Sequence, residues 1–237
     1  MSLTTQKLSI SYQQQQVIDS LDLALPAAKV SVLIGSNGCG KSTLLKAMAR
    51  LLTPQSGTVI LEGADIHTSN TAQIARKLAI LPQTPVAPEG ITVRQLVSLG
   101  RFPYQNWLRQ WSIDDEQQVE EALRLTGTAA LQHRPVDALS GGQRQRVWIA
   151  MTLAQATNTV LLDEPTTYLD LAHQIEILEL LRGLNQQQGK TIVMVLHDLN
   201  LACRYADHLV AVHQGRIYAQ GTPTQVMTET LVREVFN

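Results

Sequence analysis

A glycine-rich loop lies between an apolar run and an amphipathic segment near the start of the chain. The loop reads Gly35, Ser36, Asn37, Gly38, Cys39, Gly40, Lys41, Ser42 and Thr43. Glycines let the backbone curl so that successive N–H groups point at one phosphate, and a following helix adds its partly positive N-terminus. In this pattern Lys41 can reach the β- and γ-phosphates, and the Ser42 hydroxyl can bind Mg²⁺. The loop therefore predicts a site for a nucleoside triphosphate with Mg²⁺, rather than an ordinary glycine turn.

Two acidic residues, Asp163 and Glu164, follow the apolar run Val160–Leu162. Ligands of α/β proteins bind at the carboxyl ends of the strands. There Asp163 suits the Mg²⁺ shell, and Glu164 suits a carboxylate that polarises an attacking water. Strands often end in Asp, so this pair is weak evidence alone. Together with the glycine-rich loop it predicts a P-loop nucleotide hydrolase, a class that includes kinases, GTPases, helicases and transport motors.

A second glycine turn precedes another amphipathic segment. It reads Leu139, Ser140, Gly141, Gly142 and Gln143. A Ser-Gly-Gly turn at a helix start offers free N–H groups and the helix dipole to an anion. Two copies that meet head-to-tail would enclose a nucleotide between the loop of one and this turn of the other, and an isologous dimer would do so twice. The alternative is a glycine-rich helix cap that serves folding alone.

The chain around these motifs alternates between short apolar runs and amphipathic segments. Compact or β-rich runs predict strands at Leu3–Tyr12, Val17–Leu25, Val30–Ile34, Ser56–Glu62, Leu78–Leu81, Thr159–Leu162, Thr191–Leu196 and His208–His213. Amphipathic spacing predicts helices near Lys41 and at Thr71–Arg76, Val93–Leu99, Asp115–Leu125, Gln143–Leu153, Gln174–Gln187 and Leu199–Ala206. The polar run Gln13–Gln16 is predicted to be a solvated hairpin loop. This order predicts an α/β fold: a three-layer core with a helical insertion.

Composition restricts the class of protein further. The chain has 237 residues, with 19 Lys and Arg against 20 Asp and Glu, so its formal net charge is −1. This balance argues against a nucleic-acid partner held by bulk positive charge. No apolar run approaches the roughly 18 residues of a membrane span, and the polar stretch Thr4–Lys7 argues against a signal peptide. Two distant cysteines, Cys39 and Cys203, fit a reducing compartment better than a disulfide framework.

Over almost its whole length the chain resembles the ATP-binding cassette of ABC transporters, with Leu139–Gln143 as the signature motif. The resemblance implies that Gln83 is the Q-loop glutamine that contacts Mg²⁺, that Asp170 lies in the D-loop at the dimer interface, and that His197 contacts the γ-phosphate. It also implies that Tyr12 stacks on adenine. Taken singly, these residues could be a surface glutamine, a helix N-cap, a satisfied strand-end histidine and a packing tyrosine. Their joint order and spacing favour the functional roles.

The resemblance also implies a domain plan. The expected fold is a P-loop (RecA-like) core with an N-terminal antiparallel β subdomain and an inserted α-helical subdomain. The core would comprise residues 1–84 and 155–237, and the helical subdomain residues 85–154, all within one nucleotide-binding domain. ATP and Mg²⁺ are the expected ligands, with Lys41, Gln83, Glu164 and His197 at the reacting phosphate.

Several stretches narrow the resemblance to bacterial importers of ferric siderophores, ferric citrate, haem and cobalamin, with ferric citrate and ferric siderophore ATPases the most similar. These stretches are Leu81–Gln83, Pro88–Val93, Gly100–Pro103, Thr166–Asp170 and His197–Ala202. The expected assembly has two ATPase subunits, two integral-membrane permease subunits and an extracytoplasmic binding protein, without nucleic acid. The expected location is the cytoplasmic side of the bacterial inner membrane, as a peripheral subunit. The haem, cobalamin and other ABC transporters remain alternatives.

The aromatic-rich segment Arg101–Trp111 is expected to be irregular and to lie, with Gln83, near the docking site of the permease. The alternative is that Tyr104, Trp107 and Trp111 pack the helical subdomain. A soluble clamp on nucleic acid or ribosomes is disfavoured, because one cassette without a long coiled-coil insertion is present. A GTPase is disfavoured because no guanine-reading Asn-Lys-x-Asp sequence occurs, and a kinase would not need Leu139–Gln143.

Overall fold

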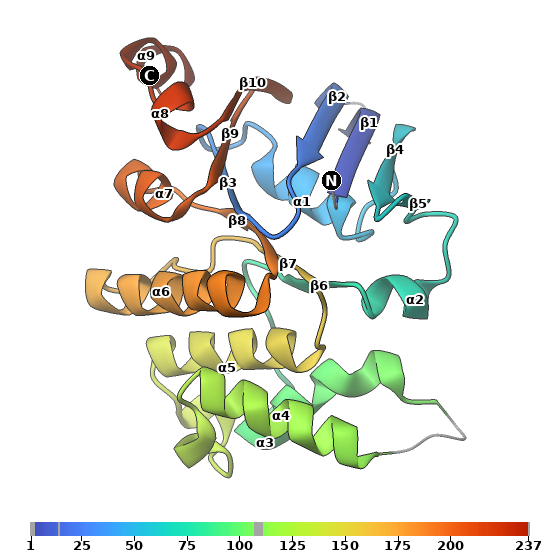
Figure 1. Cartoon of the computed structure of the whole chain (residues 1–237), viewed down its shortest axis with the longest axis vertical. Helices are drawn as coiled ribbons and strands as arrows, with labels where there is room; N and C mark the ends of the chain where they lie inside the picture. The colour runs from blue at the N-terminus through green and yellow to red at the C-terminus, as the bar shows by residue number, and fades with distance from the viewer. Residues whose placement is uncertain (1–2, 14, 107–110, 237) are drawn as a thin grey trace.

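The computed structural model describes residues 3–13, 15–106 and 111–236. An antiparallel sheet, with strand order β2-β1-β4-β5, forms one end of the molecule (Figure 1). Its strands are β1 (Leu3–Tyr12), β2 (Gln15–Leu25), β4 (Ser56–Leu61) and β5 (Ala64–Asp65). This sheet forms the N-terminal β layer that the sequence predicts.

A second sheet, with strand order β10-β9-β3-β8-β7-β6, runs through the centre of the chain. Its strands are β3 (Val30–Ile34), β6 (Leu78–Leu81), β7 (Thr159–Leu162), β8 (Thr191–Val195), β9 (His208–His213) and β10 (Arg216–Gly221). The five neighbouring strands β9, β3, β8, β7 and β6 are parallel to one another. The edge strand β10 pairs antiparallel with β9. Parallel pairing places the carboxyl ends of β3, β6, β7 and β8 along one edge, where the predicted site residues follow them.

The helices cover both faces of the central sheet. Their bounds are α1 (Lys41–Met48), α2 (Thr71–Ala75), α3 (Val93–Ser98), α4 (Ile113–Leu125), α5 (Gly141–Ala154), α6 (Leu171–Gln188), α7 (Leu199–Tyr205), α8 (Pro223–Val226) and α9 (Glu229–Phe236). The 3₁₀ segments are η1 (Leu99–Tyr104), η2 (Ala129–Leu131) and η3 (Val136–Ala138). Figure 1 shows α3, α4 and α5 gathered at the end opposite the antiparallel sheet, with α6 between them and the central sheet. The P-loop α/β fold with its helical insertion is confirmed.

Residue alternation along β3 divides the hydrophobic interior into two cores. Val32 and Ile34 pack into the core that β3 shares with helices α3 to α7, while Leu33 packs into the core shared with α1 and the antiparallel sheet. All three side chains are fully buried. Because successive side chains of a strand point to opposite faces, a continuous apolar run is required where both faces are covered.

Polar caps set the starts of the helices that carry or support the site. Thr92, Ser112 and Ser140 each accept a hydrogen bond from the third residue of the helix that follows, in reciprocal capping boxes. Asp170 caps α6 and Asp198 caps α7. Capping supplies partners to backbone N–H groups that the first turn leaves free, which explains why α5 starts at Gly141 rather than at the predicted Gln143.

The prediction of a solvated loop over Gln13–Gln16 is partly wrong. Tyr12 pairs with Gln15 and Ser11 with Gln16, so the hairpin closes tightly and β2 begins two residues earlier than predicted. Backbone pairing, which is insensitive to side-chain polarity, explains the difference. The strand β10 and the helices α8 and α9 were not predicted.

The prediction that the segment Arg101–Trp111 is irregular is wrong for its first four residues, because these belong to η1. Arg101 is buried, bonds Asp115 and Asp114 at 2.8 Å each, and lies 3.9 Å from the Tyr104 ring. The Tyr104 hydroxyl donates to the Gln155 carbonyl at 3.0 Å. Tyr104 therefore packs the helical subdomain, as the alternative interpretation held. Trp107 lies outside the described residues.

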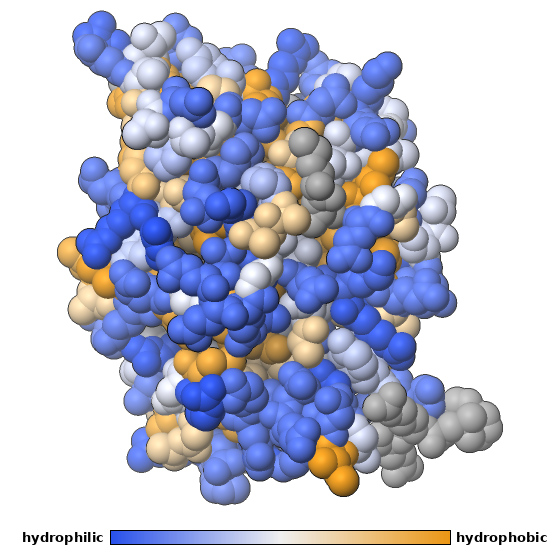
Figure 2. Space-filling model, in the orientation of Figure 1, coloured by the Kyte–Doolittle hydropathy of each residue, from blue (hydrophilic) through white to orange (hydrophobic). Residues whose placement is uncertain are grey.

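The surface in Figure 2 is mostly hydrophilic, with apolar side chains in small separate groups. Among residues 3–13, 15–106 and 111–236, every helix is too short or too polar to cross a bilayer.

Candidate active site

The glycine-rich loop joins β3 to α1 and is shaped by its glycines. Gly35 and Gly40 have φ of 150° and 109°, a region that favours glycine. A Cβ on Gly35 would lie 2.2 Å from the Val212 carbonyl oxygen. Behind the loop, the Gly215 N–H donates to the Cys39 carbonyl at 3.0 Å. The β9–β10 hairpin thus forms the rear wall of the loop.

Lys41 is held inside the loop by the loop itself. Its Nζ donates to the carbonyls of Gly35 and Ser36 at 2.9 Å each, and lies 3.7 Å from the Cys39 sulfur. Its side chain is buried although it carries a charge. A buried ammonium whose hydrogen bonds go to neutral carbonyls can exchange them for the oxygens of a phosphate, which carry the opposite charge.

The acidic residue Asp163 meets the loop at Ser42. The Ser42 hydroxyl donates to Asp163 Oδ1 at 2.8 Å, while Asp163 Oδ2 is buried and has no hydrogen-bond partner among the described residues. Burial raises the pKa of the Asp163 carboxyl, and the bond from Ser42 opposes this shift. A hydroxyl and a carboxylate with a spare buried oxygen are hard oxygen donors of the kind that Mg²⁺ takes. These two residues fit the metal that the sequence predicts.

Glu164 is the centre of a polar cluster beside the loop. His197 Nε2 lies 2.6 Å from Glu164 Oε1, and the other carboxylate oxygen accepts from Gln83 Nε2 at 2.7 Å and from the Thr167 hydroxyl at 2.9 Å. Burial alone would raise the pKa of the Glu164 carboxyl, but the hydrogen bonds from His197, Thr167 and Gln83 outweigh it and the pKa is lowered. The carboxylate therefore stays ionised at neutral pH and can accept a proton or orient water.

The backbone brings these groups together at the edge of the sheet. The Asp163 N–H donates to the Leu81 carbonyl at 2.9 Å, which ties the end of β7 to the end of β6. Glu164 then adopts a left-handed φ of 52°, uncommon for a residue with a side chain. Such strain is retained where the surrounding structure fixes it, and here three hydrogen-bonding side chains do so.

One cavity contains both the loop and the Glu164 cluster. Its lining residues are Val17, Asn37, Gly38, Gly40, Lys41, Ser42, Thr43, Glu164 and His197. The structure thus brings six of the predicted loop residues together with Glu164, His197 and, through Glu164, Gln83, while Gly35, Ser36 and Cys39 are not among the lining residues. Tyr12 ends β1, is 45% exposed and is not among the residues that line this cavity. Its predicted contact with adenine stays a prediction.

The second glycine turn lies on α5, outside that cavity. Ser140 caps α5 and exchanges hydrogen bonds with Gln143 at 3.2 and 3.3 Å, while Leu139 is buried. Ser140, Gly141 and Gln143 are exposed. The turn therefore presents the N-terminus of α5 to solvent, where a second molecule could meet it.

Asp170 does cap a helix, as the alternative interpretation proposed. Its carboxylate accepts from the His173 N–H at 2.9 Å, and that bond is the main cause of the lowered pKa of the Asp170 carboxyl. Tyr168, two residues earlier, is 96% exposed with a left-handed φ of 64°. The segment is thus exposed in one chain, and a role across a dimer interface stays a prediction.

Sequence reasoning did not single out four residues that contact the site. Val17 lines the cavity, and Thr167 bonds Glu164. Gln145 donates to the Pro165 carbonyl at 2.8 Å, and His173 lies beside Gly142. Spacing could have indicated Thr167 and His173, since each follows a singled-out acidic residue by three positions. Val17 and Gln145 arrive through tertiary contacts that local spacing does not reveal.

Comparison with known proteins shows the family of the chain. The family model for ABC transporter matches residues 18–167. The achromobactin transport ATP-binding protein CbrD of Dickeya dadantii (strain 3937) is 70% identical, over 100% of this chain and 88% of that protein. The petrobactin import ATP-binding protein FpuD of Bacillus anthracis is 59% identical, over 99% of this chain and 86% of that protein.

Among solved structures, CbiO1 from Clostridium perfringens, part of the ABC transporter complex CbiONQ, aligns with a TM-score of 0.83. It is 30% identical over 97% of this chain and 92% of that chain. The α/β scaffold that carries the glycine-rich loop and the acidic strand end is therefore shared with a component of a known ABC transporter. The chain belongs to the ATP-binding subunits of the ABC transporter family.

Proposed function

We propose that this chain is the ATP-hydrolysing motor of an importer for a ferric siderophore or ferric citrate. The observation that carries the catalytic part is the cavity in which the phosphate loop faces Glu164 and His197. The names of its relatives support the cargo, since they are proteins of achromobactin transport and petrobactin import. The proposed site of work is the cytoplasmic face of the bacterial inner membrane.

The proposed chemistry uses the residues of this cavity. The loop N–H groups and Lys41 bind the β- and γ-phosphates, and Lys41 exchanges its two carbonyl partners for phosphate oxygens. Ser42 and Asp163, with Gln83, would hold Mg²⁺, which neutralises phosphate charge when bound. Glu164 orients the attacking water and takes its proton, while His197 holds the Glu164 carboxylate and reaches the γ-phosphate.

The proposed motor stroke is the closing and opening of a homodimer. In the closed dimer, Ser140 and Gly141 of one chain face the γ-phosphate bound by the other, with Asp170 at the interface. Ser140 and Gly141 are exposed in the single chain, so a second chain can reach them. Hydrolysis removes the γ-phosphate that joins the halves, so the dimer opens.

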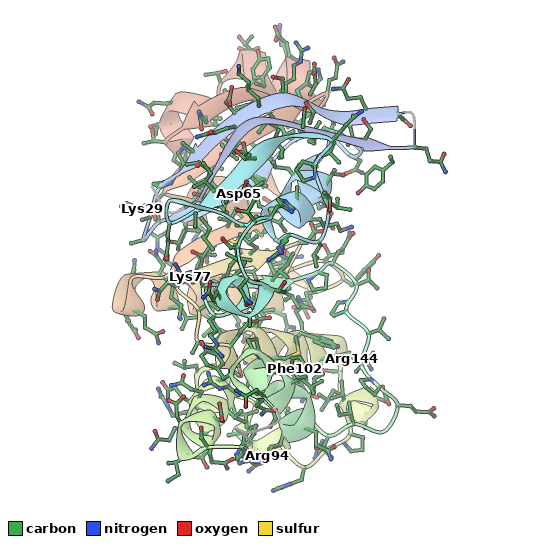
Figure 3. The ribbon with its side chains drawn as sticks, turned by 90° about the vertical axis from the view of Figure 1, so that its right-hand side faces the viewer. Lys29, Asp65, Lys77, Arg94, Phe102 and Arg144 are labelled. Carbon is green, nitrogen blue, oxygen red and sulfur yellow. The ribbon has the colours of Figure 1, made fainter. Side chains whose placement is uncertain are left out.

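A groove on the helical end is the proposed docking site for the permease subunits. It is lined by Pro88, Glu89, Gly90, Ile91, Arg94, Gln95, Ser98, Leu99, Trp111 and Glu116. Its volume of about 790 Å³, against about 140 Å³ for the phosphate cavity, suits a segment of polypeptide. Figure 3 shows Arg94 and Phe102 on this helical end, and Phe102 is 75% exposed. Two permease subunits and an extracytoplasmic binding protein complete the proposed importer.

Dimerisation of Glu164→Gln, measured by light scattering with ATP, tests the motor. The amide cannot take the proton from water, so ATP persists and the closed dimer accumulates. We expect a monomer that becomes a dimer with ATP and loses the dimer when Ser140→Arg is added. A variant that binds ATP yet stays monomeric both alone and with a co-purified permease would contradict the proposal.

Uptake of labelled cargo tests the transport assignment. We expect cells lacking the chain to lose uptake of one ferric chelate, and the wild-type chain but not Glu164→Gln to restore it. Ferric siderophores, ferric citrate, haem and cobalamin are compared in parallel. Restoration of haem or cobalamin uptake alone would replace the proposed cargo while leaving the motor in place.

A further inference from the structure

His173 lies in the first turn of α6, where it contacts two segments assigned to the dimer interface above. Helices α5 and α6 lie one above the other in Figure 1. The imidazole touches the start of α5 on one side and the residue before α6 on the other. No step of the ATP chemistry described above uses this side chain.

On the α5 side, the ring fills the space beside Gly142. A Cβ on Gly142 would lie 2.9 Å from His173 Cδ2, 3.3 Å from Cγ and 3.4 Å from Nε2. Gly142 is buried, whereas a Cβ on the neighbouring Gly141 would meet nothing within 4 Å. Gly142 is thus the position at which the signature turn rests on the imidazole.

On the other side, the same ring is fixed to Asp170. His173 Nδ1 lies 2.7 Å from Asp170 Oδ1, which also accepts the His173 N–H at 2.9 Å. The ring therefore cannot turn away from Gly142 without giving up its bond to Asp170. The imidazole thus contacts both segments, and its pair with Asp170 lies at the surface.

Other contacts near this ring join α5 to α6 and to the segment before α6. Gln145 of α5 donates to the Pro165 carbonyl, and Arg146 pairs with Glu176 of α6. Gln174 Nε2 donates to the Leu169 carbonyl at 2.8 Å, beside Asp170. These bonds hold the segments on either side of the ring, and the imidazole itself touches both Gly142 and Asp170.

We propose that His173 is a positioning residue, whose imidazole holds the signature turn and Asp170 of one chain in a single arrangement for the partner's ATP. The inference rests on the proposed function, since it requires that both segments meet the partner. It predicts that enlarging Gly142 displaces the ring and thereby Asp170, and that removing the ring relieves the crowding.

A double-mutant cycle with a matched control tests this contact. Steady-state ATPase activity is measured for Gly142→Ala, His173→Ala and the double variant, and the same cycle is repeated with Gly141→Ala. Contacting residues deviate from additivity, whereas independent ones do not. If the two substitutions acted independently, the kcat of the double variant would follow from the product of the two single effects. We expect the kcat of Gly142→Ala with His173→Ala to be at least fivefold higher than that value, with KM for ATP nearly unchanged. The Gly141 cycle is expected to be multiplicative.

Two further substitutions separate the two sides of the ring. His173→Phe keeps a ring beside Gly142 but cannot bond Asp170, and His173→Asn keeps a short donor for Asp170 but withdraws the ring. We expect His173→Asn to rescue Gly142→Ala and His173→Phe to leave it impaired. Thermal melts of each variant confirm that the comparison is made on folded protein.

The outcomes distinguish this proposal from the one on which it rests. If Glu164→Gln dimerises with ATP but the Gly142 cycle is multiplicative, the role of His173 is overturned and the motor stands. If Glu164→Gln fails to dimerise even with its permease, the motor falls and the role of His173 falls with it. Equal rescue of Gly141→Ala and Gly142→Ala would also overturn the proposal, because a Cβ on Gly141 would not meet the ring.

Discussion

The glycine-rich loop at α1 and the signature turn at α5 are both glycine-bearing helix starts, yet the chain treats them differently. In the loop, Gly35 and Gly40 have left-handed backbones, and Lys41 binds the loop's own carbonyls. In the turn, Ser140 and Gln143 satisfy each other in a capping box, and Ser140 is exposed. The loop is shaped by strain and burial, and the turn by an ordinary cap.

This difference indicates that a glycine-bearing helix start can be built for either of two kinds of contact. The contacts of the loop with Val212 and Gly215 fix its backbone from behind, and Lys41 exchanges its carbonyl partners when a phosphate binds. The turn needs no such wall, because its cap satisfies the helix start and leaves N–H groups at the surface. One site suits binding within a chain, and the other suits contact with a second chain. The predictions below test that division.

The largest expected effect is at Gly35. In Gly35→Ala the new methyl would lie 2.2 Å from the Val212 carbonyl, at a φ that disfavours side chains. We expect the free energy of unfolding to fall by about 3 kcal/mol and ATP binding to be lost. Urea melts and nucleotide titration measure both. Gly38→Ala, which has open space at its Cβ, is the matched control and should lose less. Equal losses of stability and ATP binding in the two variants would show that the close contact of Gly35 with Val212 does not shape the loop.

Ser140→Arg should separate binding from hydrolysis. Because Ser140 is exposed, we expect the folded monomer and its affinity for ATP to change little. Closure of the dimer is blocked by the bulky cation, so ATPase activity should fall about 100-fold, the usual cost of losing a donor to developing charge. Nucleotide titration and phosphate release measure the two properties. Loss of ATP affinity by the isolated chain would place the turn in its own chain's site.

His197→Ala should reveal what the Glu164 cluster contributes within the loop's cavity. The bond from His197 helps to lower the pKa of the Glu164 carboxyl below its ordinary 4.5. Its removal raises that pKa, so the acid limb of the pH–activity profile should move to higher pH, with activity at pH 7 down about tenfold. An unmoved acid limb would contradict the assignment, and exposed His133→Ala is the control.

The sign of the stability change follows from the same shift. A carboxyl with a lowered pKa stabilises the fold above its unfolded value, and this contribution is lost as pH falls through the folded pKa. In His197→Ala the folded pKa of Glu164 lies closer to its unfolded value, so this stabilisation, and its loss on acidification, should be smaller than in the wild type. Thermal melts from pH 7 downward measure it.

The smallest expected effect is at a glycine that lies outside both the loop and the signature turn. Gly183 lies inside α6, and a Cβ there would meet nothing within 4 Å. Gly183→Ala should raise the free energy of unfolding by about 0.5–1 kcal/mol, because alanine favours the helix. Urea melts measure this gain, and ATPase activity should be unchanged. A loss of stability would show that α6 needs flexibility at this position.

Prediction of the fold from the sequence succeeded where local pattern and local structure coincide, and there the structure also shows where the predicted site residues lie. The loop, the acidic strand end and the signature turn each lie within a few residues, and the strand ends place Gln83, Glu164 and His197 at one edge. Prediction was less successful where the pairing of strands determines the bounds of an element. The alternating half-exposed pattern of β10 is weak, and the polar residues Gln15 and Gln16 are drawn into β2 by the backbone of β1. The imidazole between Gly142 and Asp170 depends on how α5 meets α6, which spacing alone does not encode.

The rear wall of the phosphate loop has a consequence for biosynthesis. The loop occupies residues 35–43, but Val212 and Gly215 close it from behind, far later in the chain. A ribosome adds about 5–20 residues each second, so the loop emerges well before its wall. Contacts so distant in sequence also form late in folding, because loop closure must come first. The nascent cassette therefore completes its nucleotide site only after Val212 and Gly215 have left the ribosome, long after the loop itself.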